Sequence, residues 1–135
     1  MKIEYLSYDE KPIETKSRMD LYKNAGWWEE RKEQDIKMVL ESVISVGAWE
    51  NGKLIGFARA VSDGKFRAYV EDVVVHSGFR NNGIGKGAVT KLINELSHID
   101  VVSLFCEEHL IDFYKKNGFK PSKSQIVMHK KTGKV

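Results

Sequence analysis

The most informative part of the chain is a short glycine-rich stretch with an arginine at its start. It runs from Arg80 to Gly87, follows the apolar residues 73–75 and leads into a helix-like pattern that begins near Ile84. Because glycine has no Cβ, the backbone can turn tightly here and direct several N–H groups toward one anion. Arg80 adds a forked cation, and the start of the helix adds the positive end of its dipole. The stretch therefore predicts a site for a phosphate or pyrophosphate group.

Two well-known phosphate-binding motifs do not fit this stretch. A Walker loop needs glycine, four residues and then Gly-Lys-Ser/Thr, but Ile84 follows the correctly spaced pair Gly78 and Gly83. A Rossmann fingerprint needs Gly-x-Gly-x-x-Gly, and the third glycine of this chain, Gly87, comes one residue early. The sequence thus excludes both of these nucleotide-binding patterns.

The stretch resembles the Arg/Gln-x-x-Gly-x-Gly/Ala signature of the GCN5-related N-acetyltransferases, the GNAT superfamily. Two other segments share this resemblance. Residues 69–75 are similar to the family's fourth strand, with an acidic residue ahead of the apolar run, and residues 113–119 are similar to its Phe-Tyr-x-x-x-Gly-Phe signature. Together these segments span roughly the C-terminal half of the chain. The resemblance implies that acetyl-coenzyme A is the cosubstrate and that its acetyl group moves to a primary amine by direct attack in a ternary complex.

The resemblance also implies which residues bind coenzyme A. The glycine turn would hold the pyrophosphate, while the end of the preceding strand would hydrogen-bond the pantetheine arm like an added strand and offer an N–H group to the oxyanion. The chain departs from the family at Glu107 and Leu110, where many members have an Asn and a Ser or Ala. The expected cofactor-binding residues are Val73, Val74, Val75, Arg80, Asn81, Asn82, Gly83, Ile84, Gly85 and Lys86.

Acetyl transfer also needs a base for the amine and an acid for the leaving thiolate. Glu71 is the expected base, directly or through a water, because it lies on the strand that leads into the glycine turn. Asp72 is the alternative, although in a regular strand it would point to the opposite face. Tyr114 aligns with the family tyrosine that usually serves as the acid. A purely structural role stays open for each, as a hydrogen-bonded carboxylate or a packing aromatic.

The resemblance places the acceptor against the first two helices and the loop between them. Aromatic side chains beside carboxylates suit a cationic amine, and the alternative is that the tryptophans pin the helix pair to the sheet. The pattern does not distinguish a polyamine, an aminoglycoside, an amino acid or a protein N-terminus. The expected acceptor-binding residues are Tyr22, Trp27, Trp28, Glu29 and Glu30.

Composition sets wider bounds on the chain. Its 135 residues, 41% of them hydrophobic and 30% charged, predict one globular domain over residues 1–135. The net charge of +3 comes from basic residues interleaved with 19 acidic ones, which argues against a nucleic-acid partner. No apolar run could cross a membrane, no leader pattern is present and there is one cysteine, so the cytoplasm is expected. The four histidines lack metal-site spacing, so no metal is expected. A homodimer is left open.

Apolar periodicity gives the order of the elements. It predicts strands over residues 3–6, 44–49, 54–61, 66–75, 101–106 and 125–129, and helices over residues 17–24, 31–43, 84–96 and 110–117. The pair Asn51-Gly52 predicts a tight hairpin. With the resemblance, this order implies an α/β (α+β) fold, a mixed and mostly antiparallel sheet of six or seven strands flanked by about four helices.

Two other functions remain compatible with the sequence. One is a catalytically silent sensor that binds acyl-coenzyme A through the same turn, which cofactor binding without turnover would reveal. The other is a small basic nucleic-acid-binding domain, which a steep salt dependence of binding would reveal and which the dispersed charge disfavours.

Overall fold

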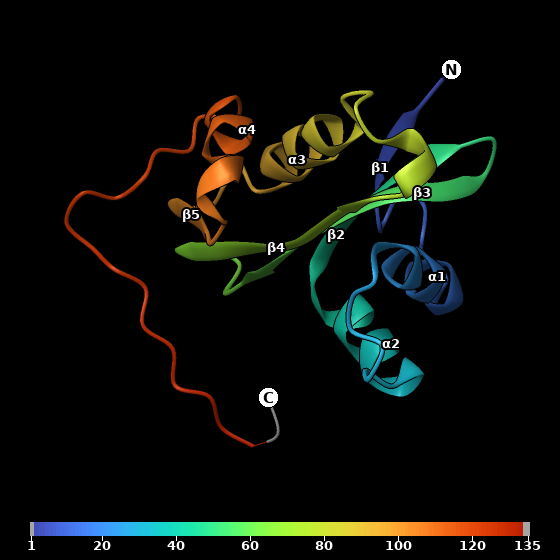
Figure 1. Cartoon of the computed structure of the whole chain (residues 1–135), viewed down its shortest axis with the longest axis horizontal. Helices are drawn as coiled ribbons and strands as arrows, with labels where there is room; N and C mark the ends of the chain where they lie inside the picture. Colours follow the sequence, from blue (N-terminus) through green and yellow to red (C-terminus); the bar gives the residue numbers. More distant parts are fainter. Residues whose placement is uncertain (1, 134–135) are drawn as a thin grey trace.

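The computed structural model describes residues 2–133, and within this range the chain forms one sheet of five strands. The strands lie across the sheet in sequence order, with neighbours from first to fourth antiparallel and the fifth parallel to the fourth (Figure 1). The sheet is mixed and mostly antiparallel, as predicted, but the predicted number of six or seven strands is wrong. The strands are β1 (Glu4–Ser7), β2 (Ile44–Glu50), β3 (Lys53–Ser62), β4 (Arg67–Val75) and β5 (Val101–Leu104).

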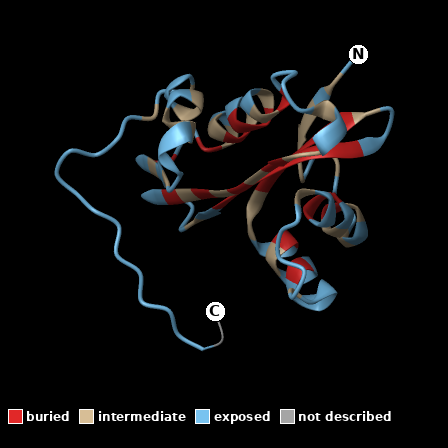
Figure 2. Cartoon of the chain, in the orientation of Figure 1, coloured by how far each residue is buried: buried red, intermediate tan, exposed pale blue. Residues whose placement is uncertain are grey.

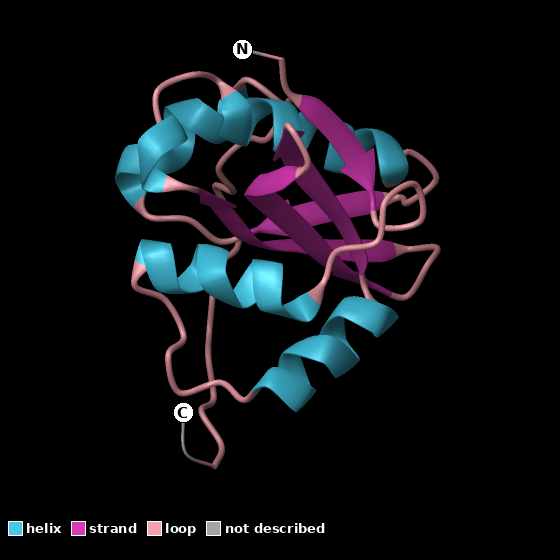
Figure 3. Ribbon diagram, turned by 90° about the vertical axis from the view of Figure 1, so that its right-hand side faces the viewer, coloured by secondary structure: helices cyan, strands magenta, loops and turns pink. Residues whose placement is uncertain are grey.

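Helices cover both faces of this sheet. One face carries α1 (Thr15–Ala25) and α2 (Glu33–Ser42), and the other carries α3 (Ile84–Glu95) and α4 (Ile111–Lys115). Figure 3 shows the same layers from the side, with the strands between two groups of helices. The bounds of all four helices agree with the predicted ranges to within two residues.

The core lies along the middle of the sheet, on both of its faces (Figure 2). Every residue of β3 from position 54 to position 60 is buried, as expected for a central strand between two helical layers. Each large aliphatic side chain removed from water here contributes about 1.5–3 kcal/mol. The buried side chains include Leu21, Tyr22, Leu40, Phe57 and Val74 toward α1 and α2, and Val46, Ala58, Val70, Ala88 and Leu92 toward α3.

Two glycines, Gly52 and Gly26, lie at tight bends of the chain. Asn51 and Gly52 have positive φ angles of 48° and 77°, the conformation of a tight hairpin turn, so the predicted hairpin between β2 and β3 is confirmed. Gly26, with φ 74°, ends α1, and the N–H group of the following Trp27 donates to the carbonyl of Tyr22. This bend directs the loop between α1 and α2 back toward the sheet.

β4 contains a bulge that the sequence did not reveal. Arg59 of β3 lies opposite Glu71 and Phe57 lies opposite Val74, so two steps along β3 match three along β4. Asp72 takes up the extra residue with a positive φ of 54°, which Asp tolerates better than most residues. The bulge shifts the alternation of side chains, so Glu71 and Asp72 do not point to opposite faces as a regular strand would require.

The predicted strand over residues 125–129 is wrong. Strands exist only where backbone N–H and C=O groups pair with a neighbour, and an apolar run cannot supply that pairing by itself. Residues 120–133 form an exposed segment after α4, in which Ile126 is 87% and Met128 is 85% exposed (Figure 2). Within this segment, the ring of His129 contacts the ring of Phe105, with centroids 5.7 Å apart.

Candidate active site

The two parallel strands β4 and β5 separate before β4 ends. Their pairing runs from Arg67 opposite Val101 to Val70 opposite Leu104, yet β4 continues to Val75. Among the described residues, the last part of β4 therefore has no strand partner on the side of β5. An extended ligand can add to such an edge through main-chain hydrogen bonds. Val73, Val74 and Val75 lie on this part of the strand.

The glycine turn after β4 exposes the start of α3. Asn81 and Gly83 have positive φ angles of 67° and 73°, and the first helical hydrogen bond runs from the N–H of Gly87 to the carbonyl of Gly83. No described side chain caps this helix, so the N–H groups of Ile84, Gly85 and Lys86 have no partner from a cap. Unpaired N–H groups at the positive end of a 12-residue helix suit a phosphate group.

The polar side chains of the turn divide into two kinds. Asn82 shapes the turn, because its Nδ2 donates to the carbonyls of Phe79 at 3.2 Å and Arg80 at 3.1 Å. Arg80 is exposed and makes one long contact, from Nε to the carbonyl of Val75 at 3.4 Å. Lys86 is exposed too. The two cations are accessible to an anion, whereas Asn82 acts on the backbone.

The three glycines of the turn, Gly83, Gly85 and Gly87, lie in different surroundings. A Cβ on Gly83 would meet nothing within 4 Å, so this position opens to the space where a ligand would lie. A Cβ on Gly85 would lie 3.3 Å from the ring of Phe113. A Cβ on Gly87 would overlap the ring of Tyr5, so Gly87 serves the packing of β1 on α3.

The two candidate base residues share one arginine. Arg59 donates from Nε to Asp72 Oδ2 at 2.7 Å and from Nη2 to Glu71 Oε2 at 2.9 Å. The Asp72 side chain is 3% exposed and the Glu71 side chain is 30% exposed. Of the pair, only Glu71 is accessible to an incoming amine.

Two more arginines reach the same aspartate, and sequence reasoning missed both. Arg18 of α1 places Nη2 3.5 Å from Asp72 Oδ2, and Arg31 places Nη1 3.9 Å from it. The Arg18 guanidinium lies over the rings of Tyr22 and Phe57, at 4.9 Å and 4.7 Å from the two centroids. Nothing near Arg18 in the sequence points to Asp72, since the contact depends on how α1 packs against β4.

The expected acceptor residues fall into an outer and an inner group. Trp27 and Trp28, 37% and 39% exposed, lie in the loop after α1 together with the exposed Glu29 and Glu30. Tyr22 is only 2% exposed, and its hydroxyl accepts a hydrogen bond from Arg18 Nη2 at 2.9 Å. Burial raises the pKa of the Tyr22 phenol above its usual value. Direct contact with an acceptor is therefore open to the loop residues but not to Tyr22.

Tyr114 lies on α4, which packs against the glycine turn through Phe113 on Gly85. Its partly buried ring contacts those of Phe113 and Phe119, with centroids 4.9 Å and 6.0 Å apart. Burial, with a smaller effect of Cys106, raises the pKa of the Tyr114 phenol, which keeps its proton at neutral pH.

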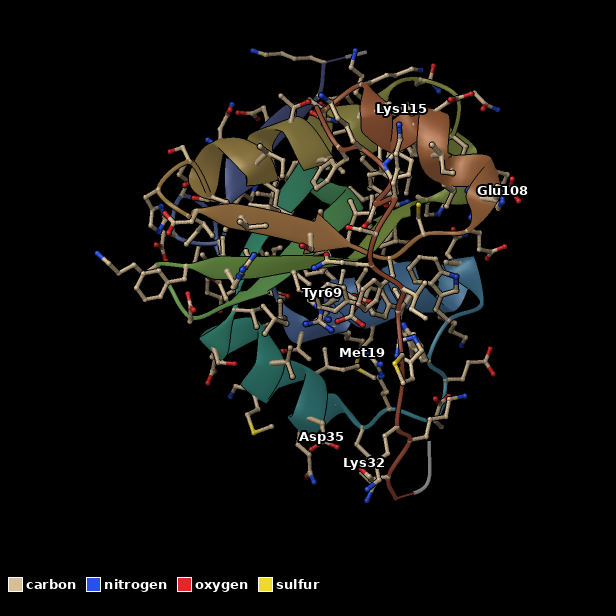
Figure 4. The ribbon with its side chains drawn as sticks, turned by 90° about the vertical axis from the view of Figure 1, so that its left-hand side faces the viewer. Met19, Lys32, Asp35, Tyr69, Glu108 and Lys115 are labelled. Atoms are coloured by element: carbon tan, nitrogen blue, oxygen red, sulfur yellow. The ribbon has the colours of Figure 1, made fainter. Side chains whose placement is uncertain are left out.

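A cavity of about 670 Å³ opens beside Tyr114, between β5, α4 and the segment 120–128. Neither the glycine turn nor Glu71 lines it. Figure 4 shows this side of the molecule, with Tyr69 of β4 between Glu108 and Lys115 above and Met19, Lys32 and Asp35 below. The strand that carries Glu71 thus faces both the α4 side and the α1–α2 side of the molecule.

The end of α1 is fastened to the connection that leads into the glycine turn. Asn24 Oδ1 accepts a hydrogen bond from the N–H group of Ser77 at 2.8 Å, and Asn24 Nδ2 donates to Ser77 Oγ at 3.1 Å. Ser77 follows β4 by two residues. The expected acceptor wall is therefore joined directly to the connection that leads into the expected cofactor turn.

Within residues 2–133, no group of three or more His, Cys, Asp or Glu side chains is arranged to hold a metal ion. None of the helices described is long and apolar enough to span a bilayer.

Comparison with known proteins identifies the family. The model of the acetyltransferase (GNAT) family matches residues 5–119, so the chain belongs to this family. An uncharacterized N-acetyltransferase, ycf52 of Pyropia yezoensis, is 39% identical over 99 residues, which are 68% of this chain and 57% of that protein. The GCN5-related N-acetyltransferase 2, chloroplastic, of Arabidopsis thaliana is 44% identical over 69 residues, which are 50% of this chain and 27% of that protein. The chain thus matches about half or less of the length of these relatives.

Solved structures agree with the fold. A probable acetyltransferase of unknown function from meticillin-resistant Staphylococcus aureus superposes with a TM-score of 0.81 at 19% sequence identity, covering 97% of this chain and 100% of that one. At this identity the likeness shows a common fold and leaves the acceptor open.

Proposed function

We propose that the protein is an N-acetyltransferase that moves the acetyl group of acetyl-coenzyme A to a primary amine by direct attack in a ternary complex. The observation that carries this proposal is the uncapped start of α3, which the glycine turn joins to a strand whose last residues lack a partner on one side. An anion-binding helix start beside an unpaired strand edge fits a ligand with a pyrophosphate and an extended amide-bearing arm.

Each candidate residue then has a defined part in binding. The N–H groups of Ile84, Gly85 and Lys86, with the side chains of Arg80 and Lys86, would hold the pyrophosphate. The backbone of Val73, Val74 and Val75 would pair with the pantetheine arm. Asn81, Asn82 and Gly83 would fix the shape of the turn, since two of these three residues have positive φ angles and Asn82 bonds two carbonyls.

Acetyl transfer needs two proton transfers and the stabilisation of one negative charge. Glu71, directly or through a water, would accept a proton from the amine, whose nitrogen forms a bond to the acetyl carbon as the carbon–sulfur bond breaks. A backbone N–H group near Val73 would stabilise the negative charge on the acetyl oxygen. Tyr114 would donate its proton to the sulfur, which its raised pKa permits because the phenol is protonated at neutral pH.

The proposal is tested by measuring acetyl-coenzyme A turnover over a panel of primary amines, together with calorimetric titration of coenzyme A. We expect micromolar-scale binding and turnover of at least one amine. Binding without any turnover would support the silent sensor instead, and an absence of binding would contradict both. The cytoplasm stays a prediction, because the Arabidopsis relative is named as chloroplastic.

A further inference from the structure

The cluster of charges beneath the acceptor loop has more positive than negative groups. Three guanidinium groups, those of Arg18, Arg31 and Arg59, surround the two carboxylates of Glu71 and Asp72. Among the described residues, no further acid contacts these three arginines within 4 Å. If all five groups are ionised, the cluster carries a net charge of +1. An uncompensated charge at a mostly buried place is costly, so the cluster favours an additional anion.

Arg18 shows where hydrogen-bond acceptors are missing. The residue is 1% exposed, and neither its Nε nor its Nη1 has a hydrogen-bond partner in the part of the chain that the structure describes. A guanidinium group does not lose its proton in proteins, so Arg18 cannot avoid this cost by becoming neutral. Buried donors are normally paired, so these two nitrogens are available to an acceptor that the described part of the protein does not supply, such as a water or a bound anion.

Arg31 provides the outer face of the same cluster. Its side chain is 34% exposed, and its guanidinium stacks on Trp28 at 3.9 Å from the ring centroid. Its Nη1 lies 3.9 Å from Asp72 Oδ2, which is too long for a hydrogen bond. The stacking fixes the plane of the guanidinium and leaves its N–H edge able to bind a planar or tetrahedral oxyanion.

The candidate base belongs to the same cluster. Arg59 bridges Glu71 and Asp72, and Arg31 approaches Asp72 from the loop. A small molecule with its amine at Glu71 could therefore place a second group near Arg31. That second group meets a net positive charge, which disfavours another ammonium group and favours an oxyanion.

We propose that the acceptor is an amine that also carries a carboxylate or phosphate group, which Arg31 binds and Arg18 attracts from beneath. This inference rests on the proposed acetyltransferase activity and names the class of its acceptor. It favours amino acids and amino phosphates over polyamines, which carry only positive charges. Arg31 thereby selects the acceptor, while Glu71 takes part in the reaction.

Matched pairs of amines test the proposal and distinguish a carboxylate-bearing acceptor from a phosphate-bearing one. Lysine and cadaverine differ by a carboxylate, and phosphoethanolamine and ethanolamine differ by a phosphate. We expect the wild-type protein to acetylate at least one anion-bearing member with a kcat/KM more than tenfold above that of its partner without the anionic group. Preference within the first pair identifies a carboxylate, and preference within the second identifies a phosphate. Equal or better use of both partners that lack the anionic group, cadaverine and ethanolamine, would overturn the inference while leaving the acetyltransferase function in place.

The variant Arg31→Gln identifies the residue responsible, with Arg67→Gln, an exposed arginine at the start of β4, as the matched control. We expect Arg31→Gln to raise KM for the anion-bearing amine at least tenfold with kcat nearly unchanged, and to leave the kinetics of the partner without the anionic group unaffected. If Arg31 only holds the loop, both members of a pair would lose activity equally, which contradicts the inference. A protein that binds acetyl-coenzyme A but acetylates no amine would contradict the proposed function itself.

Discussion

The side chain of Asp72 joins three parts of the molecule, because guanidinium groups from α1, β3 and the loop between α1 and α2 approach its Oδ2 atom. Glu71 beside it has one ion-pair partner among the described residues, Arg59, and ten times the side-chain exposure. Neighbouring carboxylates thus have different surroundings. A buried acid with several charged partners supports the structure, whereas an exposed one can exchange protons with a substrate.

We expect Asp72→Asn to lower the free energy of unfolding by about 3–5 kcal/mol, the usual cost of breaking a buried ion pair. The loss occurs because the substitution leaves the buried Arg59 and Arg18 without their shared carboxylate. Glu71→Gln, the equivalent change one residue earlier, is the control and should have a much smaller effect on stability. Denaturant unfolding of both variants measures the difference, and equal losses would contradict it.

The same pair of variants tests the base. If Glu71 accepts the proton of the amine, Glu71→Gln lowers kcat/KM at neutral pH, and activity recovers partly as rising pH deprotonates the free amine. A pH–rate profile for Glu71→Gln that superimposes on that of the wild type would remove Glu71 from the mechanism. A loss of turnover in Asp72→Asn alone, with the fold intact, would transfer the role to Asp72.

Tyr114→Phe removes only a hydroxyl group and keeps the ring that contacts Phe113 and Phe119. We expect coenzyme A to bind as before and turnover to fall about 10²-fold or more, the scale of a positioned general acid. Because burial raises the pKa of the Tyr114 phenol above its usual value, the wild-type acid keeps its proton through neutral pH. Turnover near the wild-type level would make Tyr114 a packing residue.

At the scale of elements, the glycine turn has one glycine that faces the expected ligand and others that pack against neighbouring side chains. Gly83 borders open space at a φ of 73°, whereas a side chain on Gly87 would overlap the ring of Tyr5. We expect Gly87→Ala to lower stability by about 1–3 kcal/mol through overpacking, without a specific loss of coenzyme A affinity in the folded protein. Gly83→Ala should cost about 1 kcal/mol of backbone strain and weaken coenzyme A binding as well.

Thermal unfolding and calorimetric titration of the two glycine variants separate these effects. The expected pattern is a large stability loss with retained affinity for Gly87→Ala, and a modest stability loss with reduced affinity for Gly83→Ala. The reverse pattern would mean that the ligand approaches the second turn of α3 instead of its start.

Elements defined by local residues were predictable, and those defined by distant contacts were not. Asn51-Gly52 and the glycine turn depend on the φ angles that a few neighbouring residues allow, so the sequence indicated both. The bulge at Asp72 depends on how β4 pairs with β3, and no glycine marks it. The positions of Arg18 and Arg31 depend on the packing of α1 and its loop against β4. The mistaken strand over residues 125–129 has the same cause, because strand formation requires a partner that composition does not supply.

At the scale of the whole molecule, the two sides of the proposed site are linked through β4. The acceptor loop reaches Asp72 through Arg31, the end of α1 holds Ser77 through Asn24, and α4 rests on Gly85 through Phe113. A ligand in the glycine turn therefore binds in a region that α1, α3 and α4 all contact. Binding to the folded state alone should stabilise all of these elements together.

This linkage gives a prediction for coenzyme A and the intact protein. At a fixed concentration, about one hundred times the dissociation constant of the wild type, a ligand that binds only the folded state adds about 2.7 kcal/mol to the free energy of unfolding of the wild type. We expect coenzyme A to raise the unfolding temperature accordingly, and the increase to shrink in Arg80→Gln, because Arg80 is an exposed cation of the turn. Arg67→Gln, which removes an equal charge at the far end of β4, should keep the full increase.

The size of the shift should also depend on salt, because the interaction of exposed cations with a pyrophosphate is screened as ionic strength rises. Thermal scans with and without coenzyme A, at about 0.05 M and 0.5 M salt, measure both effects in the wild type and the two variants. The wild type should lose more of its shift at high salt than Arg80→Gln, since the variant no longer has the screened contact. An equal shift in all three proteins would show that the anion does not bind beside Arg80, and would move the pyrophosphate site away from the glycine turn.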